Sequence, residues 1–307
     1  MARSRTTRET TPAATGQAAG LLWGAHEAGL RECWRRIHAA RLAAAAVKLT
    51  APAVAVGAGS GGLFERPTPA LTVARGVAVV DVVGPLSKGA DLYNWLFDTL
   101  TFGQLAELVD AARRDVRVTA LMLRVDSPGG TVAGVSDLVE AVAACRAAKP
   151  VVAAVSDLAA SCAYQVAAQA GLITVDTDGW VGSIGVYLVI DDLSRLYEDL
   201  GVAVRVFASE RDPYKGGGTP GTPISPEQAD DWQRMVDEMG TEMIRSIFRG
   251  RPALRTAAGL RLPDGRVYMG ADAVARGLAD AVASWPAVLA ALQDGDFALE
   301  RLVAAAR

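Results

Sequence analysis

Three short segments of this chain carry residues that could do nucleophilic chemistry. A serine stands among small residues in Ala160-Ser161-Cys162-Ala163-Tyr164, a lysine precedes three glycines in Tyr214-Lys215-Gly216-Gly217-Gly218, and a loop-forming stretch reads Asp126-Ser127-Pro128-Gly129-Gly130. A nucleophilic serine needs a general base to take its proton. Both histidines, His26 and His38, lie near the start of the chain, so a lysine is the candidate base in the part that follows.

Lysine is rare in this chain, which makes each one notable. Four of the 31 basic residues are lysines: Lys48, Lys88, Lys149 and Lys215. Arginine stays protonated at any working pH, whereas a buried lysine can lose its proton and act as a base. Lys215 therefore has two interpretations, a general base or an ordinary surface lysine.

The serine and glycine segments have structural explanations as well as chemical ones. Ser161 follows a strand-like run and opens a helix, so it can be an N-cap as well as a nucleophile, and Ser156 competes for any catalytic role. Gly129 and Gly130 can adopt positive φ and turn backbone N–H groups toward an oxyanion. They can equally form a plain turn in which Ser127 makes local hydrogen bonds.

The elements that must position these residues alternate between strand-like and helix-like patterns. Strand patterns cover 77–83, 118–125, 151–155, 172–175, 184–190 and 202–207, and helix patterns cover 103–115, 133–148 and 161–170. Strands separated by helices indicate βαβ units around a mostly parallel sheet, and so an α/β fold. A long helix should begin at Pro226, because Ser225 and Gln228 can form a capping box.

The chain before residue 73 has a different composition. Residues 1–20 are polar and small, and we expect them to be disordered. Residues 21–72 read as a helix followed by a linker rich in glycine, proline and alanine. We expect one folded domain over 73–285, which contains all three segments, and a helical tail over 286–307.

Composition excludes several classes of protein. A formal charge of −3 argues against a nucleic-acid partner. Cys33, Cys145 and Cys162 give neither a disulfide framework nor a metal site, and they suit a reducing, cytoplasmic compartment. The apolar run after Arg41 imitates a signal anchor, but Lys48 interrupts it and alanine and glycine dominate it, so we expect no membrane role.

Taken together and in order, the motifs are more specific than any one of them. From Val77 to Val282 the chain resembles the signal peptide peptidase A family of serine peptidases, in particular its phage head-maturation branch of the protein C type. The segments that carry the resemblance are Val83-Gly84-Pro85-Leu86, Asp126-Ser127-Pro128-Gly129-Gly130, Lys149-Pro150-Val151, Ala160-Ser161-Cys162-Ala163-Tyr164, Val181-Gly182-Ser183-Ile184-Gly185-Val186, Gly270-Ala271-Asp272-Ala273 and Gly277-Leu278-Ala279-Asp280.

The resemblance implies a Clp-protease/crotonase-like fold with ββα-type superhelix units and a Ser–Lys dyad. Ser161 matches the nucleophile and Lys215 the general base. Ser183 matches the residue that orients the lysine, and Gly130, next to Gly129, matches the glycine whose N–H contributes to the oxyanion hole. Cys162 departs from the usual small residue after the serine, and the residues before Lys215 depart from the usual pattern.

The resemblance also implies partners and a setting. The substrate would be a polypeptide, for a phage enzyme a capsid, portal or scaffold protein. The chains would form a homo-oligomeric ring in the host cytoplasm or the prohead interior, and no cofactor or metal is called for.

Three other functions fit the same sequence. A cellular peptidase that degrades cleaved signal peptides would use the same dyad. A crotonase-type acyl-CoA enzyme would use a similar fold and glycine-rich loop with an acidic residue in place of the dyad. An inactive capsid-assembly component would keep only the fold.

Overall fold

The computed structural model describes residues 71–89, 99–211, 214–256 and 261–295. These residues divide into two compact units, one formed by Leu188–Trp232 and the other by the rest. The expected disordered segment 1–20, most of the expected helix and linker over 21–72 and most of the expected helical tail lie outside the described residues. The last two residues of the expected linker, Leu71 and Thr72, instead belong to a strand.

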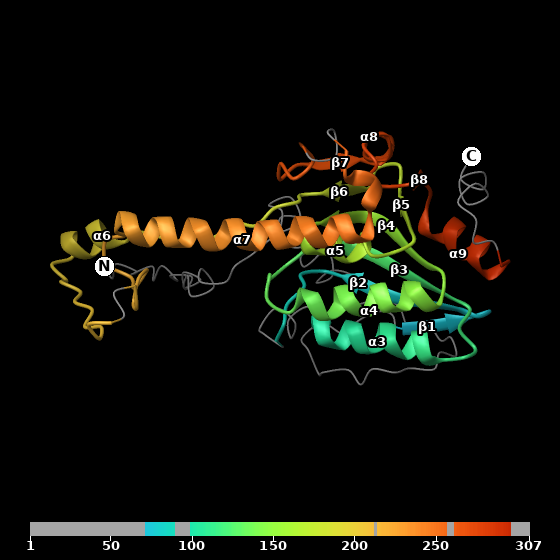
Figure 1. Cartoon of the computed structure of the whole chain (residues 1–307), viewed down its shortest axis with the longest axis horizontal. Coiled ribbons are helices and arrows are strands. Elements are labelled where there is room, and N and C mark those ends of the chain that lie inside the picture. The colour runs from blue at the N-terminus through green and yellow to red at the C-terminus, as the bar shows by residue number, and fades with distance from the viewer. Residues whose placement is uncertain (1–70, 90–98, 212–213, 257–260, 296–307) are drawn as a thin grey trace, which may run out of the picture. The chain divides into compact units, whose positions relative to one another are not determined.

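The larger unit is built on a mostly parallel sheet (Figure 1). Its described strands are β1 (Leu71–Ala74), β2 (Val77–Val83), β3 (Ala120–Ser127), β4 (Val151–Ala160), β5 (Leu172–Val175), β6 (Trp180–Gly182), β7 (Val267–Met269) and β8 (Ala281–Val282). Their order is β1-β2-β3-β4-β5-β8, and β6 pairs with both β4 and β7. Among the described pairs, β1–β2 and β6–β7 are antiparallel and the others are parallel. The predicted α/β class with a mostly parallel sheet and flanking helices is confirmed.

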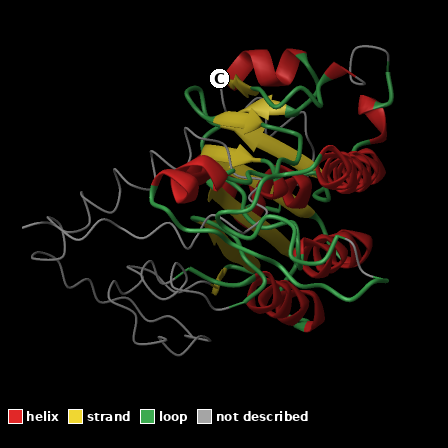
Figure 2. Cartoon of the chain, turned by 90° about the vertical axis from the view of Figure 1, so that its left-hand side faces the viewer, coloured by secondary structure: helices red, strands yellow, loops and turns green. Residues whose placement is uncertain are grey.

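Helices cover both faces of this sheet, as Figure 2 shows. The helices of the described chain are α3 (Phe102–Arg114), α4 (Val135–Ala148), α5 (Cys162–Ala167), α6 (Ser194–Asp199), α7 (Pro226–Gly250), α8 (Gly270–Ala275) and α9 (Trp285–Gln293), with a short 3₁₀ turn at Pro252–Leu254. One buried cluster joins the sheet to α3, α4, α5 and the end of α7. A second, smaller cluster joins the opposite face to α9 through Val288 and Leu292.

Local sequence explains the best-defined helices. Thr101 caps α3 with a complete capping box, because its hydroxyl accepts from Gln104 N (3.2 Å) and the Gln104 side chain accepts from Thr101 N (3.0 Å). The predicted box at Ser225 and Gln228 is confirmed in the same way, with both distances 3.2 Å. Helix α7 therefore begins at Pro226, as the sequence predicts.

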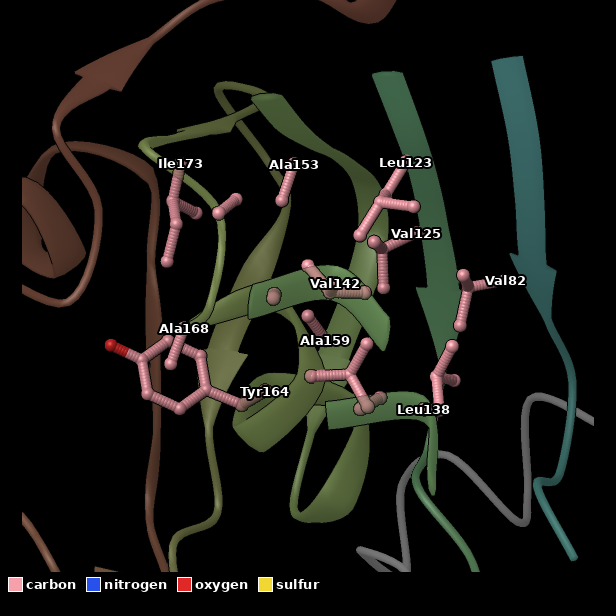
Figure 3. Packing of buried hydrophobic residues seen from close by; sticks show 14 of the residues in the cluster. Val82, Leu123, Val125, Leu138, Val142, Ala153, Ala159, Tyr164, Ala168 and Ile173 are labelled. Carbon is pink, nitrogen blue, oxygen red and sulfur yellow. The ribbon is translucent and has the colours of Figure 1, made fainter. Parts of the chain in front are cut away.

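The main core lies between β2, β3, β4, β5 and helices α4 and α5, where branched aliphatic side chains meet small ones (Figure 3). Tyr164 is fully buried in this cluster. The Tyr164 hydroxyl donates to Leu278 O at 2.9 Å, so its polar end is satisfied. This packing fixes α5, and with it the residue that precedes α5, against the sheet.

Two predicted strands are wrong. Residues 184–190 and 202–207 form no strand within the described chain, although they are rich in valine and isoleucine. Apart from the buried Ile184, their side chains are exposed or half-buried, as for Val189 (53% exposed) and Phe207 (91%). A strand needs a neighbouring strand to pair with, and composition does not supply one.

The smaller unit is stabilised by glycine-rich turns that pack on aromatic rings. Within it, a Cβ at Gly217 would lie 3.2 Å from the Trp232 ring, and one at Gly221 would lie 2.5 Å from Tyr197. Gly221 also has a φ of +87°, which favours glycine. The turn that contains Lys215 belongs to this unit.

Candidate active site

Ser161 occupies a sharp turn between strand β4 and helix α5. Its backbone has φ 56° and ψ −127°, and its hydroxyl makes no capping hydrogen bond to the helix. Ser161 N donates to Gly182 O at 2.9 Å, and Ser161 O accepts from Gln165 N at 3.0 Å, so the residue is held on both sides. A non-glycine residue in such a conformation costs about 1–3 kcal/mol and marks sites where function constrains the backbone. Hydrolases present a nucleophilic serine on this kind of strained strand-to-helix turn.

The loop after β3 is organised by the side chain of Ser127. Its buried hydroxyl donates to Gly84 O at 2.6 Å and accepts from Gly129 N at 3.1 Å. Gly84 N donates in turn to Asp126 O at 2.9 Å. Ser127 thus makes the local hydrogen bonds of the structural interpretation, and by doing so it fixes the course of the two glycines that follow.

Those two glycines lie directly behind Ser161. Gly129 has a φ of +92°, and a Cβ there would lie 2.8 Å from the Ser161 Cβ. A Cβ at Gly130 would overlap the Leu86 carbonyl oxygen, because the backbones of Leu86 and Gly130 form a parallel bridge. The absence of side chains is therefore what lets the loop and the serine turn come together.

The residue after the nucleophile, Cys162, is buried next to the glycine loop. Burial raises the pKa of the Cys162 thiol to about 12, while hydrogen bonds from Gly130 N–H and from Cys162's own N–H oppose that rise. Backbone N–H groups next to a nucleophilic serine are the kind of donor that stabilises the negative oxygen of an acyl-transfer intermediate. Gly129 contributes the conformation that turns the following N–H group.

Ser183 is the neighbour of Ser161 across the sheet. Strand β6 pairs with β4 so that Ala160 stands opposite Gly182, which brings the two following serines side by side. Ser183 is nearly buried and also has a positive φ, of 48°. In the described chain three non-glycine residues have positive φ, and two of them are Ser161 and Ser183. The strain in this backbone is thus concentrated at predicted site residues.

The lysines differ in their surroundings. The Lys149 amine donates to Ala112 O (2.9 Å) and Asp115 O (2.6 Å) and so closes the end of helix α3. Lys88 is exposed, and its side chain lies next to Gly134. Lys215 is exposed in a turn of the smaller unit, whereas Ser161 belongs to the larger one. The pairing of Ser161 with Lys215 therefore stays a prediction.

Ser156 lies away from this site. Its hydroxyl lies 3.5 Å from Val125 O within the parallel pair of β3 and β4, before the serine turn. Ser156 is not among the described residues with positive φ. Among the serines considered from sequence, Ser161 is the one on which the geometry converges.

Sequence reasoning missed the antiparallel strand pair that supports Ser183 from its far side. Strand β7 pairs antiparallel with β6, and Ser183 N donates to Arg266 O at 2.6 Å. The signal was the Asp264-Gly265 pair ahead of a short β-branched and aromatic run. Strand β6 is too short, at Trp180–Gly182, for a periodic pattern to reveal it as the partner.

The described residues contain neither a membrane-spanning helix nor a metal-binding cluster. No helix in the described ranges is long and apolar enough to cross a membrane. Over the same ranges, no group of three or more histidine, cysteine, aspartate or glutamate side chains is placed to hold a metal ion.

Known proteins resemble this chain in sequence. It is 34% identical over 175 residues to a putative protease of Methanocaldococcus jannaschii, which covers 57% of this chain and 55% of that protein. It is 31% identical over 212 residues to the chloroplastic serine protease SPPA of Arabidopsis thaliana (67% and 30%). It is 28% identical over 226 residues to the capsid assembly protease C of Escherichia phage lambda (72% and 50%). The chain thus spans about half or less of each of these relatives.

Solved structures of low sequence identity match the chain as well. An enoyl-CoA hydratase/isomerase family protein from Silicibacter pomeroyi is 17% identical, with a TM-score of 0.44 over 77% of this chain and 82% of that one. The model of Peptidase family S49 matches residues 143–298, about half of the chain. This range contains Ser161, Ser183 and Lys215 and begins after Gly130. On this match, and with the relatives named above, the chain belongs to peptidase family S49.

Proposed function

We propose that this protein is a serine endopeptidase in which Ser161 is the nucleophile and Lys215 the general base. The observation that carries the proposal is the strained turn at Ser161, with Gly129 and Gly130 directly behind it. Membership of a peptidase family supports the same reaction.

The proposed reaction needs no group beyond the chain and water. The Ser161 hydroxyl attacks the peptide carbonyl and its proton passes to the neutral Lys215 amine. The N–H groups of Gly130 and Cys162 hold the resulting oxyanion. The protonated amine then gives its proton to the leaving amine, and water hydrolyses the acyl-enzyme by the same route.

Lys215 must become neutral and reach Ser161 for this to work. It is exposed in the smaller unit of the single chain. Burial disfavours the charged form of a lysine, so the proposal requires that substrate or a second copy of the chain cover it. A homo-oligomeric ring would supply such cover, with Ser183 orienting the amine.

We further propose a polypeptide of a phage capsid as the substrate. The relative in phage lambda is a capsid assembly protease, and it is similar over 72% of this chain. The similarity to the chloroplastic protease of Arabidopsis supports the alternative of a cellular peptidase. The two are separated by whether the cut sites fall in capsid and scaffold chains or in signal peptides.

The test is cleavage of an unfolded polypeptide by purified protein, with the cut sites mapped by mass spectrometry. Wild type and Ser156→Ala should cleave at the same sites, whereas Ser161→Ala should lose about 10⁴-fold or more in rate. Lys215→Ala and Lys215→Arg should both be inactive, because arginine cannot give up its proton. Near-normal cleavage by Lys215→Arg would exclude the dyad, and thioester hydrolysis by Ser161→Ala would favour an acyl-CoA enzyme.

A further inference from the structure

Gly182 and Ser183 adopt a backbone conformation that is unfavourable without support from neighbouring segments. Their φ values are +125° and +48°, two successive residues in a region that side chains disfavour. Such a conformation persists only where the surroundings impose it. On one side the surroundings are Ser161, whose N–H donates to Gly182 O at 2.9 Å.

The other side is held by one turn, Leu262–Tyr268, which we call the Asp264 turn. Ser183 N donates to Arg266 O at 2.6 Å, and Gly265 N donates to Ile184 O at 3.3 Å. A Cβ at residue 182 would lie 2.7 Å from the same Arg266 oxygen, so the approach depends on glycine there. Both backbone hydrogen bonds that flank Ser183 on this side come from the turn.

The Asp264 turn is in turn fixed by a single carboxylate. Asp264 Oδ1 accepts from Arg266 N at 3.0 Å, and Oδ2 accepts from Arg266 Nε at 2.9 Å and from the Tyr268 hydroxyl at 2.8 Å. Tyr268 is 8% exposed and belongs to the main core. Its ring also lies under the Arg276 guanidinium, 4.2 Å from the ring centre. The Asp264 carboxylate thus connects Arg266, whose carbonyl receives the Ser183 amide, to the buried ring of Tyr268.

We propose that the Asp264 turn positions Ser183 for the reaction at Ser161, with Asp264 and Tyr268 as positioning residues. Neither touches the reacting atoms. They act through the Arg266 carbonyl, which sets where the Ser183 backbone lies and therefore where its hydroxyl can meet the lysine amine. This role rests on the proposed function, because it assumes that Ser183 orients the base.

Kinetics of two variants test the role. Asp264→Ala should lower kcat about tenfold with KM within about twofold, because a misplaced group affects the chemical step more than binding. Tyr268→Phe should lower kcat in the same direction and by less, about threefold, since the ring remains.

The chain supplies a matched control in Asp115-Val116-Arg117. There too an aspartate Oδ1 accepts from the N–H of the arginine two residues on, at 2.9 Å, and its carboxylate binds the same guanidinium. This turn lies between α3 and β3, and Asp115→Ala should leave kcat and KM unchanged. An equal loss of kcat in Asp115→Ala and Asp264→Ala would overturn the proposal.

A double variant separates positioning from general loss of stability. In a Ser183→Ala background, Asp264→Ala should lower kcat no further, since residues that act through one another are not additive. Full additivity of the two losses would overturn the proposed role.

Hydrogen exchange tests the structural half without relying on activity. The Ser183 amide should exchange at least about tenfold faster in Asp264→Ala than in wild type or Asp115→Ala, because its acceptor is released. Unchanged exchange would overturn the proposal. If wild type cleaves nothing, the proposed function is wrong, and exchange at Ser183 alone decides whether the turn holds this residue.

Discussion

At the scale of residues, the site depends on the absence of side chains at three glycines as much as on the side chains of its serines. Gly129, Gly130 and Gly182 each stand where a side chain would overlap the backbone or side chain of another segment. Ser161 and Ser183 both adopt positive φ. Glycine provides close approach, and the two serines carry the strain and the hydroxyl groups.

A single methyl group at Gly130 should therefore abolish the site. Gly130→Ala forces the Leu86 carbonyl away and displaces the N–H group that we propose holds the oxyanion, so the cleavage rate should fall about 10²-fold or more. The matched control is Gly240→Ala in α7, where a Cβ meets nothing within 4 Å. That variant should keep full activity and gain about 0.5–1 kcal/mol in stability. Initial rates and circular dichroism check both, and a folded, fully active Gly130→Ala would contradict the oxyanion role.

At the scale of elements, strand β5 and the end of α7 are joined to the segment before β8 by buried polar contacts. The Arg251 side chain is 9% exposed and binds Asp280 through both nitrogens, at 2.9 and 2.8 Å. Arg251 also donates to Gly277 O, and Asp280 accepts from Ile173 N at 2.7 Å. Gly277–Asp280, one of the segments that carry the family resemblance, thus has a structural role, because it connects strand β5 to the end of α7.

Loss of the buried Arg251–Asp280 pair should lower the stability of the fold. Asp280→Ala leaves a buried guanidinium without its partner, so the free energy of unfolding should fall by about 3–5 kcal/mol. The comparison is Asp294→Ala, which breaks the exposed Arg75–Asp294 pair and should cost about 0–1 kcal/mol. Urea unfolding followed by tryptophan fluorescence measures both. Equal losses in the two variants would contradict a special role for the buried pair.

The sequence predicts elements well where a local pattern decides them. Strands at 77–83 and 172–175 and the start of α7 agree with the structure to the residue. Strand β4 runs to Ala160, beyond the predicted end at 155, because its second half pairs with β6. That pairing depends on a three-residue strand and on β7 far along the chain, which no local pattern contains. The Asp264 turn was not predicted for the same reason, because the strand it supports, β6, is far away in the sequence.

Site residues follow the same division. Ser161 and the two glycines were predictable because strand, turn and helix follow one another in sequence. The Ser127 hydroxyl was ambiguous until Gly84 O was found as its partner, a contact between separate strands. Lys215 lies in a segment where apolar composition predicted a strand at 202–207 and the structure has none. Its approach to Ser161 depends on how separate compact units meet, which periodicity does not encode.

At the scale of the whole molecule, two buried ionisable groups link stability to pH. Burial raises the pKa of the Tyr164 hydroxyl above its ordinary value of 10.0, and burial raises the pKa of the Cys162 thiol from 9.0 to about 12. The folded chain therefore keeps both protons at a pH where the unfolded chain has released them. Their contribution to stability is complete below about pH 9 and is lost as the pH rises.

Alkaline conditions should consequently unfold the protein. Above about pH 9, stability should fall by up to about 1.4 kcal/mol per pH unit for each group that is ionised in the unfolded chain. Tm measured between pH 8 and pH 11 should decline less steeply in Cys162→Ala and Tyr164→Phe than in wild type. Identical slopes in all three proteins would contradict the link.

The pairing of β6 with β7 has a consequence for when the site can exist. During synthesis, Ser161 and Gly182 leave the ribosome long before Arg266, whose carbonyl receives the Ser183 amide. Until that late segment has been translated and has docked, the strained serine pair lacks its support on one side. Until then the proposed catalytic serines lack this support, so we expect no proteolysis by a nascent chain that ends before Arg266.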